Sequence, residues 1–106
     1  MEFLGKNYVP YPRLKDADVK KDRKLFNEII RNIKKLYKAG LVHGDLSEYN
    51  VLIGDKVYII DMSQSVLLNH PNAQTFLERD VKNICKFFSR YFAVEHDKIL
   101  EKIKTD

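Results

Sequence analysis

The sequence has little cysteine: Cys85 is the only one among 106 residues, and it stands in the apolar stretch ICKFF. A single cysteine excludes an internal disulfide and a zinc site built from several thiolates, and its apolar setting predicts a buried side chain and not a reactive thiol. No apolar run approaches the ~20 residues that a membrane-spanning helix needs, and the N-terminus lacks the apolar core of a secretory signal. We therefore expect a cytoplasmic protein with no membrane partner.

What the sequence does contain is typical of one small globular domain, residues 1–106, with 44% hydrophobic and 32% charged residues. The formal net charge is +4, a mild excess that is compatible with an anionic ligand or an RNA-rich partner. The densest basic run consists of Lys20, Lys21, Arg23 and Lys24. It is either a solvated helix end or a phosphate-binding patch.

The first half of the chain predicts an extended segment followed by a helix. Prolines keep residues 1–15 extended, because each proline disfavours helical backbone at the residue before it. Apolar residues then recur at helical spacing and predict an amphipathic helix over residues 18–39. Asp16 or Asp18 would cap its start, and Gly40 would mark its end.

The second half predicts a hairpin and two further helices. Two short apolar runs, 51–53 and 57–60, flank a Gly-Asp-Lys turn and predict a β-hairpin. Residues 62–71 should form a loop. An apolar stripe over 76–92 and another over 94–104 predict helices, and this order of elements indicates a mostly helical α+β domain.

The chemistry is concentrated around the hairpin. His43 and Asp45 stand on one loop, Asn50 enters the first strand, and Asp61 leaves the second. A tight hairpin returns its second strand beside its first, so Asp45, Asn50 and Asp61 should lie at one edge of the domain with oxygens near one another. Each of these residues taken alone could be an ordinary turn or cap.

Phosphoryl transfer requires such a set of groups. Mg²⁺ prefers carboxylate and amide oxygens, which suits Asn50 and Asp61, and a separate carboxylate must orient the acceptor hydroxyl and take its proton, which suits Asp45. This is the order of a protein-kinase catalytic loop and its metal-binding aspartate. His43 is expected to hold the backbone and to take no part in the chemistry.

One more acidic residue stands out. Asp80 lies close to the inward stripe of its helix, and a buried carboxylate must be paired or hydrogen-bonded. We expect it to be buried against the backbone N–H groups of the catalytic loop. The alternative is a surface pair with Arg79 or Lys82.

The segments LVHGDLSEYNVLI and VYIIDMSQSV resemble the RIO atypical serine/threonine kinases, and the RIO-one subfamily in particular. HPNAQTFLERDVKNICKFF resembles the helix that follows them in that family, MEFLG the hinge between its lobes, and VPYPRLKD the segment after the hinge. The resemblance implies the C-terminal lobe of a protein-kinase-like fold with a small catalytic β-hairpin. Residues 1–15 would then be the hinge and lead-in, and residues 41–66 the catalytic and metal-binding loops.

The same resemblance implies a Mg-ATP-dependent phosphotransferase or ATPase, with Mn²⁺ as an alternative metal. Asp45 would be the catalytic acid/base, Asp61 both a metal ligand and a transient phosphate acceptor, and Asn50 a second metal ligand. The missing N-terminal lobe would be a partner, as would a pre-ribosomal particle or its rRNA during maturation of the small ribosomal subunit. The residues implied to contact ATP are Met1, Glu2, Phe3, Ser47, Asn50, Leu52 and Ile60.

Departures from the ordinary protein kinases leave other functions open. Ser47 stands where those kinases have a lysine, and no Ala-Pro-Glu segment is present. No phosphate-gripping loop or strand lysine appears either, so this chain alone is expected to be inactive. Two alternatives remain: a small-molecule phosphotransferase of the aminoglycoside-kinase type, and a non-catalytic module that docks on a ribosomal precursor through its basic surface.

Overall fold

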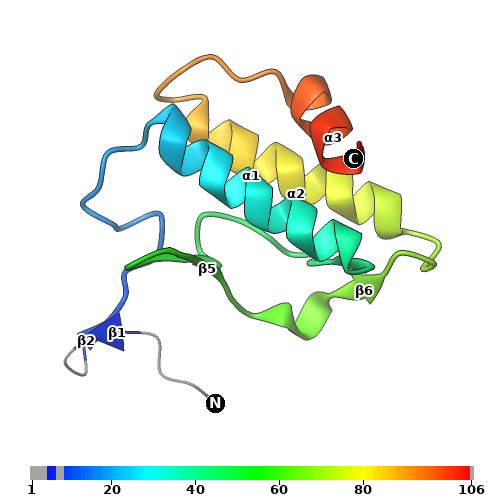
Figure 1. The fold of residues 1–106 in the computed structure, drawn as a ribbon, viewed down its shortest axis with the longest axis horizontal. Helices are drawn as coiled ribbons and strands as arrows, with labels where there is room; N and C mark the ends of the chain where they lie inside the picture. Colours follow the sequence, from blue (N-terminus) through cyan, green and yellow to red (C-terminus); the bar gives the residue numbers. More distant parts are fainter. Residues whose placement is uncertain (1–4, 7–8, 106) are drawn as a thin grey trace.

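The computed structural model describes residues 5–6 and 9–105, and it confirms the α+β class. Three helices pack together, and three two-stranded antiparallel sheets lie to one side of them (Figure 1). No helix among the described residues is long and apolar enough to cross a membrane. The elements are β1 (Gly5–Lys6), β2 (Val9–Pro10), α1 (Arg23–Lys38), β3 (Leu41–Val42), β4 (Val51–Ile53), β5 (Val57–Ile59), the 3₁₀ turn η1 (Met62–Gln64), β6 (Val66–Leu67), α2 (Ala73–Phe88) and α3 (His96–Lys104).

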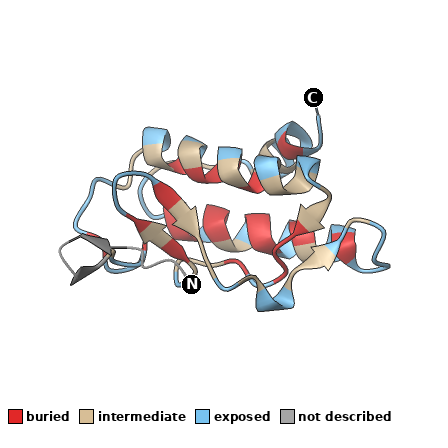
Figure 2. Cartoon of the chain, turned by 60° about the horizontal axis from the view of Figure 1, so that its bottom comes forward, coloured by how far each residue is buried: buried red, intermediate tan, exposed pale blue. Residues whose placement is uncertain are grey.

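The core lies between α1 and α2, and α3 packs against both. Buried residues occupy the facing sides of the helices and the inner side of the β4–β5 hairpin (Figure 2). Phe26 of α1 and Phe88 of α2 are fully buried and meet edge to face, with ring centroids 5.2 Å apart. Such a pair stabilises the fold by about 0.5–1.5 kcal/mol beyond the burial of its apolar area.

The start of α1 differs from the expectation. The helix begins at Arg23, and the capping residue is Asp22, whose carboxylate accepts a hydrogen bond from the Leu25 N–H at 2.9 Å. The predicted start at residue 18, with Asp16 or Asp18 as cap, is therefore wrong. The physical reason is that residues 13–17 form a turn, in which the N–H groups of Asp16 and Ala17 bond to the Arg13 carbonyl.

The extended segment before that turn packs along the hairpin. The Leu14 N–H donates to the Val51 carbonyl at 2.7 Å, and the Ile53 N–H donates to the Pro12 carbonyl at 2.9 Å. Tyr11 stacks on Tyr58, with ring centroids 5.9 Å apart. The lead-in thus lies against the free edge of β4 and helps to fix the hairpin.

The predicted hairpin is present, with Val51 opposite Ile59 and Ile53 opposite Val57, and its second strand ends at Ile59, one residue before the predicted end. Residues 62–71 are more ordered than the expected loop, because they form η1 and then β6, which pairs with β3. The last two helices are each shorter at one end than predicted: α2 ends at Phe88, and α3 begins at His96. The local apolar pattern continues past these ends because Phe92 packs on Phe26 and Phe88 from outside the helix.

Candidate active site

Asp80 of α2 anchors the loop that follows β3. Its side chain is only 1% exposed, and its two carboxylate oxygens accept hydrogen bonds from the backbone N–H groups of Gly44 at 2.8 Å and Leu46 at 3.0 Å. The predicted buried anchor is confirmed, and a surface pair with Arg79 or Lys82 is excluded. Burial raises the pKa of the Asp80 carboxyl, and these two hydrogen bonds oppose that rise.

Two neighbours of Asp80 on α2 donate hydrogen bonds to backbone carbonyls of the same loop. The Arg79 guanidinium donates to the Gly44 carbonyl at 2.7 Å, and the Asn83 amide donates to the Leu46 carbonyl at 3.1 Å. Sequence reasoning missed this role for both residues. The available signal was their spacing, one residue before and three residues after Asp80, which places all three near one face of a helix.

His43 connects the loop to the hairpin. Its ring is 2% exposed, its Nδ1 accepts the Asp45 N–H at 3.1 Å, and its Nε2 lies 2.7 Å from the Ile60 carbonyl. Because Nδ1 is the acceptor, the proton is assigned to Nε2, which donates to Ile60. His43 therefore holds two backbone segments, as expected, and one of them leads directly into Asp61.

Hydrogen bonds join the backbone segments that carry Asp45, Asn50 and Asp61 where the loop enters the hairpin. The Asn50 side-chain amide donates to the backbone carbonyl of Asp45 at 2.5 Å, and the Asn50 carbonyl accepts the Ile60 N–H at 2.9 Å. The carboxylates of Asp45 and Asp61 are exposed, while Asn50 is half-buried. The backbone of this junction is thus fixed while both carboxylates remain accessible to a ligand.

Asp61 has an unusual backbone. It has φ 61° and ψ 62°, the left-handed conformation, and among the described residues it is the one non-glycine with positive φ. Its Oδ1 accepts a hydrogen bond from the Ser63 hydroxyl at 2.9 Å. A left-handed aspartate is uncommon, and residues held in such conformations cluster at functional sites.

The turn that follows Asp61 packs closely against Gly44, the residue before Asp45. Gly44 has φ +89°, and a Cβ added there would lie 2.5 Å from the backbone oxygen of Gln64. Only glycine allows this approach, because no real Cβ atom comes so close to a backbone oxygen. The contact keeps Asp61 and Asp45 on adjoining segments.

Two of the residues implied to contact a nucleotide, Leu52 and Ile60, lie on one face of the hairpin. Leu52 pairs with Tyr58, and strand alternation places Ile60 on the same face as Tyr58. Leu52 and Ile60 are half-buried, and so is Ser47, whose hydroxyl accepts the Tyr49 N–H at 3.2 Å. Met1, Glu2 and Phe3 lie outside the described residues.

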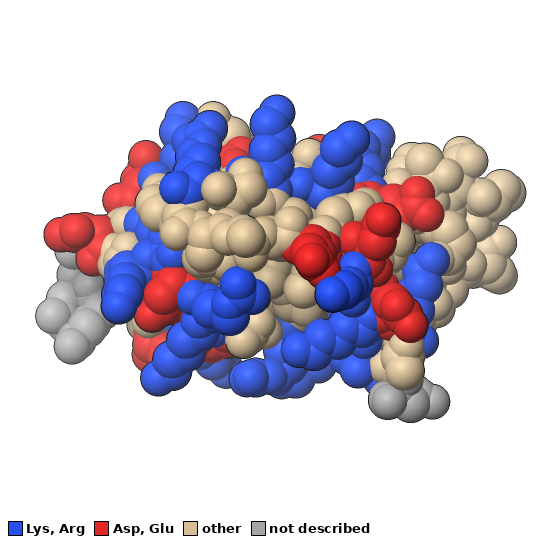
Figure 3. All heavy atoms as spheres, turned by 90° about the horizontal axis from the view of Figure 1, so that it is seen from above, with Lys and Arg blue, Asp and Glu red and all other residues tan. Residues whose placement is uncertain are grey.

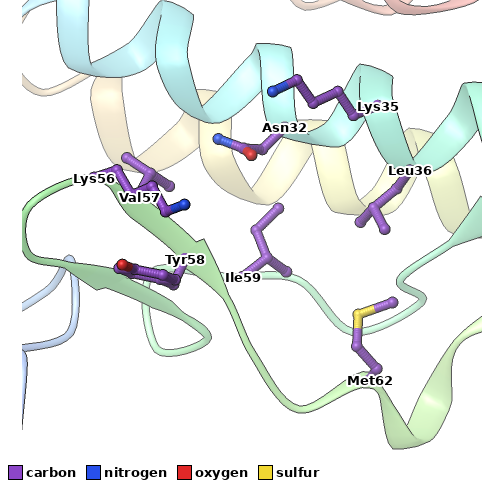
Figure 4. A pocket seen from close by; sticks show the side chains of 8 residues that line it. All are labelled: Asn32, Lys35, Leu36, Lys56, Val57, Tyr58, Ile59 and Met62. Carbon is purple, nitrogen blue, oxygen red and sulfur yellow. The ribbon is translucent and has the colours of Figure 1, made fainter. Parts of the chain in front are cut away.

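A cavity of about 470 Å³ opens between α1 and β5, apart from the three site residues (Figure 4). None of Asp45, Asn50 and Asp61 lines the cavity. Met62, which does line it, directly follows Asp61 in the sequence. Within the described part of the chain, no group of three or more His, Cys, Asp or Glu side chains could hold a metal ion. The lining residues are Asn32, Lys35, Leu36, Lys56, Val57, Tyr58, Ile59 and Met62.

Comparison with known proteins shows to which family this chain belongs. A sequence profile described as the RIO domain matches residues 1–100. The chain belongs to the RIO kinase family. The resemblance of the chain to that family is thereby confirmed, and so is the protein-kinase-like fold.

Relatives in the RIO family are serine/threonine-protein kinases by name. The Thermoplasma acidophilum Rio1 kinase is 41% identical over 105 residues, covering 98% of this chain and 55% of the relative. The Methanocaldococcus jannaschii Rio1 kinase is 50% identical over 92 residues, covering 85% and 32%. The chain therefore spans about half the length of the first relative and a third of the second.

A solved structure of a RIO kinase has the same fold. The Rio2 kinase of Chaetomium thermophilum, crystallised as an ADP/Mg²⁺-phosphoaspartate complex, superposes with a TM-score of 0.72 at 29% identity. The match covers 92% of this chain and 35% of that one. Both comparisons thus relate the present chain to one part of a longer kinase.

Proposed function

We propose that this chain is the catalytic lobe of a Mg-ATP-dependent RIO phosphotransferase or ATPase that acts together with an N-terminal lobe. The observation that carries the proposal is the junction of Asp45, Asn50 and Asp61. Two exposed carboxylates and one amide belong to backbone segments joined by direct hydrogen bonds. Family membership supports the same assignment over a small-molecule phosphotransferase.

Asn50 and Asp61 are the proposed metal ligands, and the chemistry of their oxygens fits Mg²⁺. The Nδ2 of Asn50 is engaged by the Asp45 carbonyl, so its Oδ1 is the atom left for a cation. The Asp61 carboxylate is exposed and receives one hydroxyl. When bound, Mg²⁺ would neutralise charge on the ATP phosphates, while Leu52 and Ile60 would lie under the adenine.

Asp45 is the proposed general base. Its N–H is bonded to His43 and its carbonyl to Asn50, so its backbone is held on both sides while its carboxylate stays free. Such a carboxylate can orient an acceptor hydroxyl and take the proton released as the hydroxyl attacks the γ-phosphate. Positioning of this kind is most of what a phosphotransferase contributes to the rate.

Asp61 is also a proposed phosphate acceptor. A Rio2 relative has been crystallised with a phosphoaspartate, ADP and Mg²⁺. In this chain an Asp61 carboxylate oxygen would form a bond to the γ-phosphorus as the bond to the β–γ bridging oxygen breaks, giving ADP and an acyl phosphate. Water would then release phosphate and restore the carboxylate, which is ATP hydrolysis overall.

The experiment compares the isolated chain with a two-lobed protein, in which the N-terminal lobe of the Thermoplasma acidophilum relative precedes Met1. Further contacts to the phosphates would come from that lobe, so the chain alone should bind Mg-ATP weakly and transfer no phosphate. The chimera should hydrolyse ATP and label an acceptor such as a pre-ribosomal particle, which fits a role in maturation of the small ribosomal subunit. Robust turnover by residues 1–106 alone, or a folded chimera that does not bind nucleotide, would contradict the proposal.

A further inference from the structure

A basic groove runs between α1 and α3, away from the catalytic junction. It consists of two hollows of about 290 Å³ each, and Lys34 of α1 and Lys102 of α3 line both of them. Arg31 lines one hollow and Lys98 the other. Figure 3 looks onto the molecule from the side where α3 lies, and Lys and Arg side chains are prominent over that face.

The positive charge of this groove is poorly neutralised. Across the described part of the chain, no carboxylate lies within ion-pair distance of Arg31, Lys34 or Lys102. Lys98 does pair with Glu95 at 2.7 Å, and Glu101 is the one carboxylate in the wall. Cations brought together on a concave surface without partners raise the local concentration of an anionic ligand.

The densest basic run of the sequence is less available to an anionic ligand than the groove is. The Lys21 ammonium bonds to the Ala17 carbonyl. The Arg23 guanidinium bonds to the Ala93 carbonyl at 3.1 Å and lies 4.7 Å from the centroid of the Phe92 ring. Two of its four cations therefore support the fold, whereas the cations of the groove face solvent.

We propose that the α1–α3 groove binds the phosphodiester backbone of single-stranded nucleic acid. Two successive hollows that share Lys34 and Lys102 suit a chain of phosphates better than they suit a flat membrane surface or a single phosphate. No aromatic side chain lines either hollow, so the groove offers no platform on which a base could stack. Recognition is therefore of the backbone, and RNA and DNA of equal length bind alike. This proposal does not depend on the phosphotransferase assignment.

Salt dependence tests the proposal directly. The chain is titrated into fluorescently labelled oligo(U) and oligo(dT) of equal length, and binding is followed by anisotropy. Three to four phosphate contacts predict a slope of about −2 to −3 for log Kobs against log salt, which is a loss of roughly 20- to 50-fold between 50 and 200 mM. Binding that is insensitive to salt, or that is confined to one of the two oligonucleotides, would overturn backbone recognition.

Matched variants locate the site. Lys34→Gln/Lys102→Gln should flatten the slope by about 1.4 and weaken binding at low salt, because two of the contacts are lost. Lys82→Gln/Lys86→Gln removes the same charge from exposed positions of α2 outside the groove and should leave the slope nearly unchanged. Glu101→Gln should tighten binding by removing the opposing charge.

Two results would count against the groove. If the two lysine pairs have equal effects, binding reflects net charge and the groove is not the site. If poly-glutamate displaces the oligonucleotide as well as unlabelled RNA does, the partner is an acidic protein and the phosphodiester assignment fails. Circular dichroism and thermal melting of each variant establish that a loss of binding is not a loss of fold.

Discussion

Oδ2 of Asp80 lies 2.8 Å from the backbone nitrogen of Gly44, which is 36 residues away in the sequence. Asp80→Ala would leave this N–H and that of Leu46 buried without an acceptor, at a cost of about 1–3 kcal/mol each. We therefore expect the free energy of unfolding to fall by about 2–6 kcal/mol in urea denaturation. Glu78→Ala, at an exposed position of the same helix, should change it by less than about 0.5 kcal/mol. Equal effects of the two substitutions would show that the anchor is unimportant.

The same carboxyl predicts a pH dependence. Because burial raises the pKa of Asp80 in the folded protein, the folded state holds this proton at higher pH than the unfolded chain does, where the pKa is about 3.9. The stability that this shift contributes is fully present below about pH 3.9 and is lost as the pH rises through the folded-state pKa. The advantage of the wild type over Asp80→Asn, which cannot titrate, should thus shrink above about pH 4 and then level off. An advantage that grows with pH in urea titrations would mean that the hydrogen bonds outweigh burial.

Gly44 and Gly40 form a matched pair. Their φ angles are +89° and +90°, but a Cβ at Gly40 would meet nothing within 4 Å, whereas one at Gly44 would clash with Gln64. Gly40→Ala should therefore cost about 1–2 kcal/mol of backbone strain, and Gly44→Ala about 1–3 kcal/mol more. Thermal or urea unfolding of both variants measures the difference. Similar costs would show that the Gln64 turn moves away freely.

Cys85 should be inert in the native protein. It is buried as predicted, and burial raises the pKa of its thiol to about 11, so the thiolate is scarce at pH 8. A disulfide reagent at pH 8 should react with it only as fast as the chain opens, and at once in urea. Ser89→Cys, which adds a thiol at an exposed position, is the control and should give one rapid equivalent in the native state. Rapid modification of the unaltered chain would contradict the burial of Cys85.

Asp45 and Asp61, the two carboxylates proposed to be catalytic, should respond differently to substitution in the two-lobed protein. Asp61→Asn should abolish a hydroxylamine-sensitive phosphoenzyme and weaken Mg-ATP affinity, since only a carboxylate can form an acyl phosphate and a metal ligand also holds the ground-state complex. Asp45→Asn should slow turnover with nucleotide affinity nearly intact, because a base acts on the proton moved in the transition state. Nucleotide titration and phosphoenzyme trapping separate the two. The opposite pattern would reverse the assigned roles.

Much of the local structure followed from the sequence. The hairpin was predictable because its strands are short and apolar around a Gly-Asp-Lys turn, and the core of α1 because apolar residues recur at helical spacing. The order of His43, Asp45, Asn50 and Asp61 along the chain was enough to predict a phosphoryl-transfer site, and those roles remain a proposal. The position of Asp80 beside an inward stripe was enough to indicate burial, because an ionisable group there must find partners.

Only the tertiary structure decided which groups those partners are and where the elements end. Asp22 caps α1 because residues 13–17 are committed to a turn, and β6 forms because β3 lies beside it. The spacing of Arg79 and Asn83 places them near Asp80 on one helix, but it does not say which carbonyls they bind. Lys34 and Lys102 line the same hollows although no local pattern in the sequence connects them. Periodicity reports which face of an element is buried, but contacts between segments tens of residues apart depend on how those faces pack.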